Sequence, residues 1–314
     1  MMGRSDIPQK SGNAHLVVGA EFGRWFDEAQ AKATSEGVPL EELYWFLLEL
    51  TDLDRLSLRL RAFQTAPTVP LKLPFPELVH RWEQRLHQRI PVQYLVGRVH
   101  WRNFSLLVSP AVLIPRPETE LIVDLAVAAI QQVNSGPGLD DVHHWADLGT
   151  GSGAIALGLA AEFAQVVIHA VDRSSEALEV ARANAALLHL HNRVHFYQGV
   201  WFEPLQPFKG RLAGMVSNPP YIPSPAISEL EPEVAHHEPH LALNGGPDGL
   251  NCLRELVESA PDYLRPDGFW IVEVMAGQAD WVAQRLHQRG YHQIQIHRDL
   301  AGIDRFVSAH CPSS

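Results

Sequence analysis

The sequence has only two cysteines in 314 residues, Cys252 and Cys311. That number excludes a disulfide framework and a cysteine-based zinc site. Histidine is common, with 17 residues, but adjacent pairs such as those at 143–144 and 236–237 lack the spacing of metal ligands. We therefore expect no metal centre, and we interpret the histidines as surface or incidental residues.

Long apolar runs and an excess of basic residues are also missing. No run is long enough to cross a bilayer, and the first residues, MMGRSDIPQKSGNAH, lack the apolar segment of a signal peptide. Acidic residues outnumber basic ones by 36 to 25, which gives a formal net charge of −11. Tight nonspecific binding of nucleic acid depends on Lys and Arg that neutralise phosphates. The composition therefore predicts a cytoplasmic protein without membrane segments or direct nucleic-acid partners.

The first third of the chain has the pattern of a small helical domain. Hydrophobic residues make up 46% of the chain, enough for real cores. Residues 20–88 have amphipathic helical spacing, including one long helix predicted over PLEELYWFLLELTDLDRLSLRL. We predict a helical substrate-docking domain over 1–90. Residues 91–115 are rich in β-branched and aromatic side chains, which predicts a β-hairpin linker.

From residue 116 to 314 the pattern predicts one α/β domain. PETELIVDLAVAAIQQV reads as a helix, and NSGPGLDD at 134–141 as a loop. From His143 onward, apolar strands alternate with helices, which predicts a doubly wound, mostly parallel sheet with helices on both faces. Two successive strands, HQIQIHRDL and DRFVSAH, end the chain and predict an antiparallel edge hairpin.

A glycine-rich loop follows the first strand of this alternating region, within DLGTGSGAIAL. The loop consists of Gly149, Thr150, Gly151, Ser152 and Gly153. Its glycines let the backbone turn tightly and approach a ligand. Asp172 ends the next strand, where a carboxylate can bind both hydroxyls of a ribose. Strand, glycine loop, helix, strand and acid together predict a nucleoside site. The loop alone fits NAD as well as S-adenosylmethionine, because Ala154 completes a dinucleotide fingerprint.

The short stretch VSNPPYIPS decides between these two cofactors. Asn218 stands where an apolar strand stops, and Pro219 and Pro220 stiffen the turn that follows it. A hydride-transfer enzyme has no evident use for a rigid amide there. Methyl transfer to a weakly nucleophilic amide or amine nitrogen does, because Asn218 and the Pro219 carbonyl can hold that nitrogen in line with the methyl group. Tyr221 can pack on the planar target.

These motifs together resemble a known family. DLGTGSGAIAL with NPPY resembles class I S-adenosylmethionine-dependent methyltransferases of the amino-methylating group, whose fold has seven strands. Four segments are similar to the HemK/PrmC family: LIPRPETE (113–120), SNPPYIP (217–223), EPEVAHHEPHLALNGGPDGL (231–250) and RDLAGIDRFV (298–307). That family methylates the N5 nitrogen of the glutamine in the Gly-Gly-Gln motif of peptide chain release factors. The resemblance runs from about Pro91 to the C-terminus.

The resemblance implies a role for each motif. Residues 149–153 would cradle the methionine part of S-adenosyl-L-methionine, and Asp172 would bind the ribose. Trp201 would lie beside the adenine, although a core tryptophan is an alternative interpretation. Residues 218–221 would form the catalytic and substrate-binding turn, with Asn218 also beside the cofactor. Val200 departs from the pattern, since an acidic or polar residue is expected there.

Several alternatives remain open at this point. Arg116, Glu118 and Glu120 could anchor the linker near the cofactor, or they could form a helix cap with a surface ion pair. No general base is evident, so we assign catalysis to positioning and electrostatics. The substrate could instead be a ribosomal-protein glutamine, or an adenine N6 nitrogen in nucleic acid. The acidic composition speaks against nucleic acid.

Overall fold

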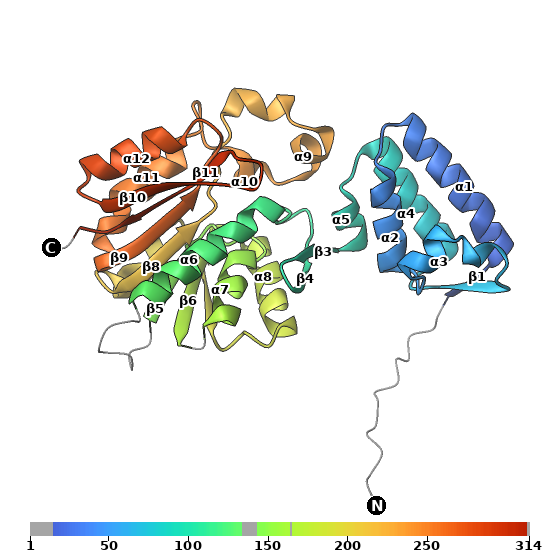
Figure 1. Ribbon diagram of the computed structural model, residues 1–314, viewed down its shortest axis with the longest axis horizontal. Coiled ribbons are helices and arrows are strands. Elements are labelled where there is room, and N and C mark those ends of the chain that lie inside the picture. The colour runs from blue at the N-terminus through green and yellow to red at the C-terminus, as the bar shows by residue number, and fades with distance from the viewer. Residues whose placement is uncertain (1–14, 134–142, 164, 313–314) are drawn as a thin grey trace, which may run out of the picture. The chain divides into compact units, whose positions relative to one another are not determined.

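The computed structural model describes residues 15–133, 143–163 and 165–312. The predicted loop at 134–141 lies outside these residues. The chain divides into two compact units, Met1–Val96 and Gly97–Ser314 (Figure 1). Among the described residues, none of the helices is both long enough and apolar enough to span a membrane.

The first unit is mainly helical. Its helices are α1 (Gly19–Ser35), α2 (Leu40–Leu50), α3 (Arg55–Arg59), α4 (Phe75–Gln88) and α5 (Val92–Val96), with a 3-10 turn η1 (Ala62–Gln64). Helix α2 begins after Pro39 and has two glutamates in its first turn, where the helix dipole favours negative charge. Its apolar stripe is fully buried in a core rich in aromatic side chains, which include Phe22, Phe26 and Trp82.

Three local predictions for this part of the chain were wrong. The single helix predicted from Pro39 onward ends at Leu50, because Thr51 is extended and its hydroxyl donates to the Leu47 carbonyl at 2.7 Å. Two strands, β1 (His15–Val18) and β2 (Thr68–Leu71), form an antiparallel pair that helical spacing did not predict. VQYLV, at the start of the predicted hairpin linker, is helix α5, which buries Val92 and Leu95 in the helical core.

The second unit contains the predicted seven-stranded sheet. Its strands are β5 (His143–Leu148), β6 (Val166–Asp172), β7 (Val194–Gln198), β8 (Leu212–Ser217), β9 (Leu264–Glu273), β10 (His292–Arg298) and β11 (Asp304–His310). Their spatial order is β10-β11-β9-β8-β5-β6-β7. β11 runs antiparallel to both neighbours, and the other described pairs are parallel. The predicted fold class, with its antiparallel edge hairpin, is confirmed.

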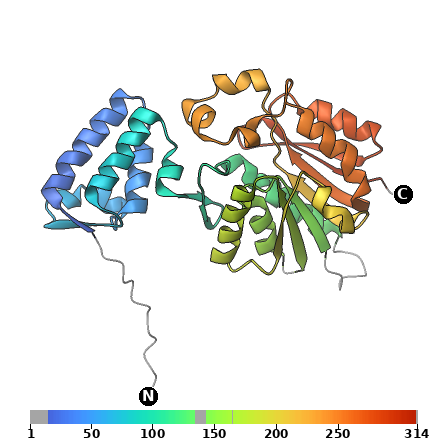
Figure 2. The ribbon, with the colours of Figure 1, turned by 180° about the vertical axis from the view of Figure 1, so that it is seen from behind.

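Helices cover both faces of this sheet (Figures 1 and 2). They are α6 (Glu120–Val133), α7 (Ala154–Glu162), α8 (Ser175–Leu187), α11 (Asn251–Ser259) and α12 (Ala279–Gln288), whereas the short helices α9 (Pro232–His237) and α10 (His240–Leu243) belong to the connection between β8 and α11. Four 3-10 turns accompany them: η2 (Pro117–Thr119), η3 (Glu203–Phe208), η4 (Ser224–Glu229) and η5 (Ala260–Asp262). Ala146 packs in one core with α11 and α12, whereas its neighbour Trp145 lies near Ala129 and Ile130 of α6. Successive strand residues face opposite sides, so these helices lie on opposite faces.

A second, short sheet precedes α6. It consists of β3 (Arg98–Trp101) and β4 (Phe104–Leu107), an antiparallel hairpin in the region where one was predicted. The Asn184 side chain on α8 accepts from Leu107 N at 2.7 Å and donates to Leu107 O at 3.0 Å. The same Nδ2 donates to Ser152 O at 2.9 Å. One buried amide therefore joins the hairpin to the glycine loop.

The interpretation of the histidines as surface or incidental residues was wrong for His169. This side chain on β6 is buried. Its Nε2 lies 2.9 Å from Nδ1 of His144, and its Nδ1 lies 3.1 Å from the Tyr197 hydroxyl. The Phe208 ring packs against it with a centroid distance of 3.9 Å. The imidazole is therefore part of a polar row that crosses β5, β6 and β7.

Candidate active site

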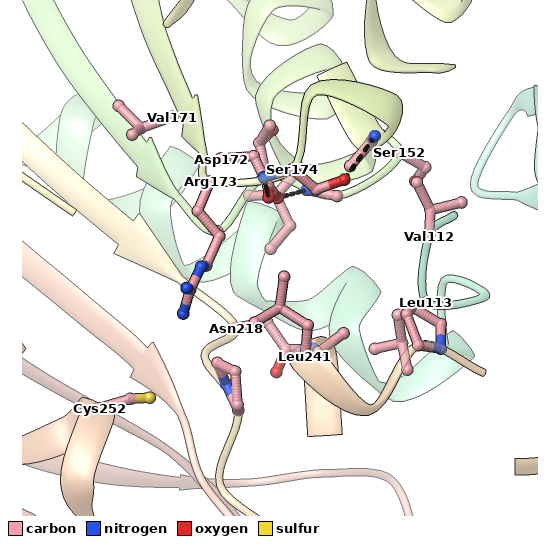
Figure 3. A pocket seen from close by; sticks show the side chains of 18 of the residues that line it. Val112, Leu113, Ser152, Val171, Asp172, Arg173, Ser174, Asn218, Leu241 and Cys252 are labelled. Atoms are coloured by element: carbon pink, nitrogen blue, oxygen red, sulfur yellow. Dashed lines mark hydrogen bonds between the residues drawn. The ribbon is translucent and has the colours of Figure 1, made fainter. Parts of the chain in front are cut away.

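A cavity of about 320 Å³ lies at the carboxyl ends of β5, β6 and β8 (Figure 3). That volume is in the range of small-molecule sites, and the location is where open parallel sheets bind ligands. Strand β8 pairs with β5 although β6 and β7 separate them in the chain, so the topological switch point falls here. The wall includes Val112, Leu113, Thr119, Gly149, Thr150, Gly151, Ser152, Asp172, Val200, Trp201, Asn218, Pro220, Leu241 and Cys252.

The glycine loop turns through left-handed backbone conformations. Gly149, Gly151 and Gly153 have φ values of 77°, 54° and 83°. Residues that carry a Cβ rarely adopt these conformations. The amides of Gly149 and Thr150 both donate to Val171 O, at 2.9 and 3.0 Å. A Cβ on Gly151 would meet nothing within 4 Å, so this part of the backbone faces open space. The loop therefore offers its backbone to a ligand in the cavity.

A buried carboxyl supports this loop from below. Asp147 accepts from the Thr150 hydroxyl at 2.6 Å and from Ala156 N, in the first turn of α7, at 3.1 Å. Burial raises the pKa of Asp147 to about 7, although both hydrogen bonds lower it. Asp147 is not among the described residues that line the cavity. It holds the glycine loop to the start of α7.

Asp172 lies at the end of β6 and lines the cavity. Its Oδ2 accepts from Gly151 N and its Oδ1 accepts from Ser174 N, both at 2.9 Å (Figure 3). Burial raises its pKa, and the backbone hydrogen bonds lower it. A carboxylate has about four acceptor positions, so these bonds leave room for the hydroxyls of a ligand. The geometry thus suits the ribose role that the sequence predicts for Asp172.

Trp201 lies beside the glycine loop. It has a left-handed φ of 47°, and its ring lies 3.4 Å from the position that a Cβ on Gly149 would occupy. The ring lines the cavity and also packs on the adjacent core, so both interpretations of this residue hold in part. Beside it, Val200 N donates to Glu203 Oε2 at 3.0 Å. Position 200 lacks the expected acidic or polar side chain, and Glu203 is an acidic residue close to it.

The Asn-Pro-Pro-Tyr turn begins directly after β8. Asn218 and Pro220 line the cavity, whereas Pro219 is buried. Ser217, the last residue of β8, donates from its hydroxyl to Leu148 O at 2.6 Å. On the other side, Ile222 N donates to Leu243 O at 3.0 Å. The turn is therefore fixed at both ends as well as by its prolines.

Tyr221 was expected to pack on the planar target group of the substrate, but its side chain does not face the cavity. It is not among the described residues that line the cavity. Its hydroxyl donates to Glu273 Oε1 at 3.0 Å, and its ring packs on the core beneath the turn. Gln278 Nε2 donates to the Tyr221 carbonyl at 3.0 Å. The structure thus anchors this tyrosine within the protein.

Sequence reasoning missed two residues that join this turn to the rest of the unit. The Asn218 Nδ2 donates to Thr119 Oγ1 at 3.3 Å, and Thr119 Oγ1 donates to Glu273 Oε2 at 2.6 Å. Thr119 stands within LIPRPETE, and Glu273 is the last residue of β9. The available signal was a buried acid at the carboxyl end of a core strand.

Arg116 and Glu120 of RPETE have separate partners. Arg116 pairs with Glu238 at 2.6 Å, and the Glu238 side chain is 1% exposed. Burial raises the pKa of Glu238, and the charge of Arg116 lowers it. Glu120 accepts from Arg102 N at 2.8 Å. The Arg116 pair joins two segments that carry the family resemblance, at the wall of the cavity. Among the described residues no group of three or more potential ligands could hold a metal ion.

Comparisons with known proteins agree with this geometry. Residues 133–235 match the family described as Methyltransferase small domain. A release factor glutamine methyltransferase from Synechocystis sp. is 50% identical over 298 residues, which cover 95% of this chain and 98% of that protein. Another of that name, from Thermosynechococcus vestitus, is 46% identical over 297 residues, covering 94% and 99%. The hMettl16 catalytic domain, crystallised with MAT2A 3'UTR hairpin 6, aligns with a TM-score of 0.53 at 12% identity. That alignment covers 76% of this chain and 82% of the domain, and it concerns the fold alone.

The sheet order and the cavity at its carboxyl edge define a class I methyltransferase. Within that class, the identity to relatives over nearly the whole chain is decisive. This chain belongs to the release factor glutamine methyltransferase family.

Proposed function

We propose that this protein transfers a methyl group from S-adenosyl-L-methionine to the N5 amide nitrogen of the glutamine in the Gly-Gly-Gln motif of peptide chain release factors. Membership of the family supports the reaction and the substrate class. The observation that carries the proposal is the rigid Asn-Pro-Pro-Tyr turn, which presents Asn218 to the same cavity as the glycine loop. The protein would act in the cytoplasm, where release factors act.

The residues present fit this cofactor. The open backbone at Gly151 suits the methionine part, and the spare acceptor positions of Asp172 suit the two ribose hydroxyls. The Trp201 ring supplies an aromatic surface for the adenine. When bound, the cofactor supplies an electrophilic methyl group on a sulfonium.

The work left to this chain is to position a weak nucleophile. The lone pair of an amide nitrogen is delocalised, so the reaction needs that nitrogen held close to the methyl group and in line with it. Asn218 and the carbonyl of Pro219 would accept hydrogen bonds from the glutamine NH2 group. A new nitrogen–carbon bond forms as the sulfur–carbon bond breaks, and the nitrogen gives up one proton to solvent. Preorganised polar groups then account for the acceleration.

One assay tests this proposal against its rivals. The full-length protein is incubated with methyl-labelled S-adenosylmethionine and a purified release factor, and the label is located by mass spectrometry. We expect one methyl group on the Gly-Gly-Gln glutamine. A release factor with Gln replaced by Ala in that motif is the matched control and should stay unlabelled. Label in purified ribosomal protein or duplex DNA, with none in the release factor, would refute the proposal.

A further inference from the structure

We propose that Thr119 and Glu273 are positioning residues that determine which way round the Asn218 amide faces the substrate. This inference rests on the proposed function. Neither residue needs to touch the substrate glutamine for this role, and Glu273 is not among the described residues that line the cavity.

The proposal begins from a chain of three hydrogen bonds that starts at Asn218 and Thr119 in the cavity wall and ends behind it at Glu273 and Tyr221. Asn218 Nδ2 donates to Thr119 Oγ1 at 3.3 Å, and Thr119 Oγ1 donates to Glu273 Oε2 at 2.6 Å. The other oxygen of Glu273, Oε1, accepts from the Tyr221 hydroxyl at 3.0 Å. Thr119 and Glu273 are both buried. Four residues from three distant parts of the sequence thus meet at one carboxylate.

The chain of bonds has a direction. An ionised carboxylate only accepts hydrogen bonds, and a threonine hydroxyl has a single proton. When the Thr119 proton goes to Glu273, the Thr119 oxygen can only accept from its other neighbour. That neighbour must then be the NH2 end of the Asn218 amide, because the amide oxygen cannot donate. Since the two ends of an amide are told apart by their partners, the network assigns Nδ2 to Thr119.

The consequence for the substrate lies at the other end of the amide. With Nδ2 held by Thr119, Asn218 Oδ1 is left as the acceptor for the substrate. An acceptor is what the NH2 group of a glutamine requires, and a reversed amide would present a donor to a donor. Threonine and glutamate therefore select the productive one of two orientations that have nearly the same shape.

The ionisation state of Glu273 determines whether Thr119 must donate to it, and therefore whether the Asn218 amide is held in one orientation. Burial raises the pKa of the Glu273 carboxyl, and the hydrogen bonds from Thr119 and Tyr221 lower it. The charge of Arg305 also lowers this pKa, whereas that of Glu118 raises it. A protonated Glu273 could donate to Thr119, and Thr119 could then donate to a reversed Asn218. The kcat of methyl transfer should therefore decrease as pH falls through the pKa of Glu273.

The first test removes the hydroxyl but keeps the shape of residue 119. We expect Thr119→Val to lower kcat on a release factor by about 10- to 100-fold, the scale of losing alignment at a reacting centre. Cofactor affinity by calorimetry should stay within about twofold, and Thr119→Ser should restore most of the activity. Ser308→Ala removes a buried hydroxyl on β11 whose partner is His297, outside this network, and it should leave kcat nearly unchanged.

Two further measurements exclude a merely structural role. Thr119→Val should have no additional effect in the Asn218→Ala protein, because Thr119 acts through that amide. Glu273→Gln cannot ionise, so its kcat should lack the acid limb of the parent enzyme. An active parent enzyme together with a fully active Thr119→Val variant would overturn the positioning role and leave the proposed function intact. Additive effects of Thr119→Val and Asn218→Ala would overturn it too. An inactive parent enzyme would instead refute the proposed function, on which this role depends.

Discussion

At the scale of single residues, Asp172 holds the backbone of two loops and is proposed to bind the ribose of the cofactor. One substitution tests the ribose role. Its carboxylate holds Gly151 N and Ser174 N at 2.9 Å and has acceptor positions left for a ribose. We expect Asp172→Ala to weaken S-adenosylmethionine binding by about 1.5–3 kcal/mol, the range for hydrogen bonds to a charged group. Isothermal calorimetry measures this change. Glu179→Ala, at an exposed acid on α8, is the control, and equal affinities for the two variants would refute the ribose role.

Asn218 is the residue on which methyl transfer should depend most. It is partly exposed at the cavity wall and follows the last strand residue, so its loss should leave the fold and cofactor binding intact. We expect Asn218→Ala to lower kcat by roughly 10²–10³, the scale for one preorganised polar group. Asn218→Asp should also fail, because a carboxylate has no NH2 to give Thr119. Near-parental rates for Asn218→Ala in a labelled-methyl assay would mean that the turn is only structural.

At the scale of helices and strands, the local sequence pattern was sufficient for the seven-stranded sheet and for the glycine loop. The seven strands and the glycine loop follow from apolar runs and from turn residues whose conformations need no distant partner. VQYLV was predicted as strand because of its β-branched residues, yet Val92 and Leu95 are buried as one side of helix α5. Tertiary packing overrides such a weak local preference. Glu273 was missed for a related reason, since its partners Thr119 and Tyr221 lie far away in sequence.

The row of rings across β5, β6 and β7 should make the sheet sensitive to acid. Burial lowers the pKa of His169 to about 3 in the folded protein, whereas the same imidazole in the unfolded chain is protonated below about pH 6.5. The stability that neutral His169 contributes is therefore fully present above about pH 6.5 and is lost as pH falls toward 3, at about 1.4 kcal/mol per unit. We expect His169→Phe to flatten this part of the stability curve.

Urea unfolding from pH 7 down to pH 4 measures the effect on the sheet. The comparison is between slopes and not absolute stabilities, because the new side chain also loses the contacts with His144 and Tyr197. His191→Phe, at an exposed position outside the row, is the control and should keep the parental slope. An unchanged slope in His169→Phe would show that His169 titrates normally in the folded protein.

At the scale of the whole molecule, the division of labour between the two units remains a prediction. The cavity, the glycine loop and the Asn-Pro-Pro-Tyr turn all belong to the unit Gly97–Ser314, which has its own core. The other unit has a separate aromatic core, and none of its described residues lines the cavity. A unit with a core but without a share in the chemistry suits the docking of a protein substrate.

A truncation that begins at Gly97 tests this docking role, because the cut falls after helix α5, which packs with the first unit. We expect the fragment to fold, to bind S-adenosylmethionine like the parent protein and to methylate a short Gly-Gly-Gln peptide at a similar rate. On an intact release factor its kcat/KM should fall by about 10- to 100-fold, which corresponds to about 1.4–2.8 kcal/mol of lost binding. Circular dichroism and the cofactor affinity establish that the fragment is folded. Full activity on the intact substrate would exclude the docking role, since a unit that contributes no binding energy cannot be needed to recruit the release factor.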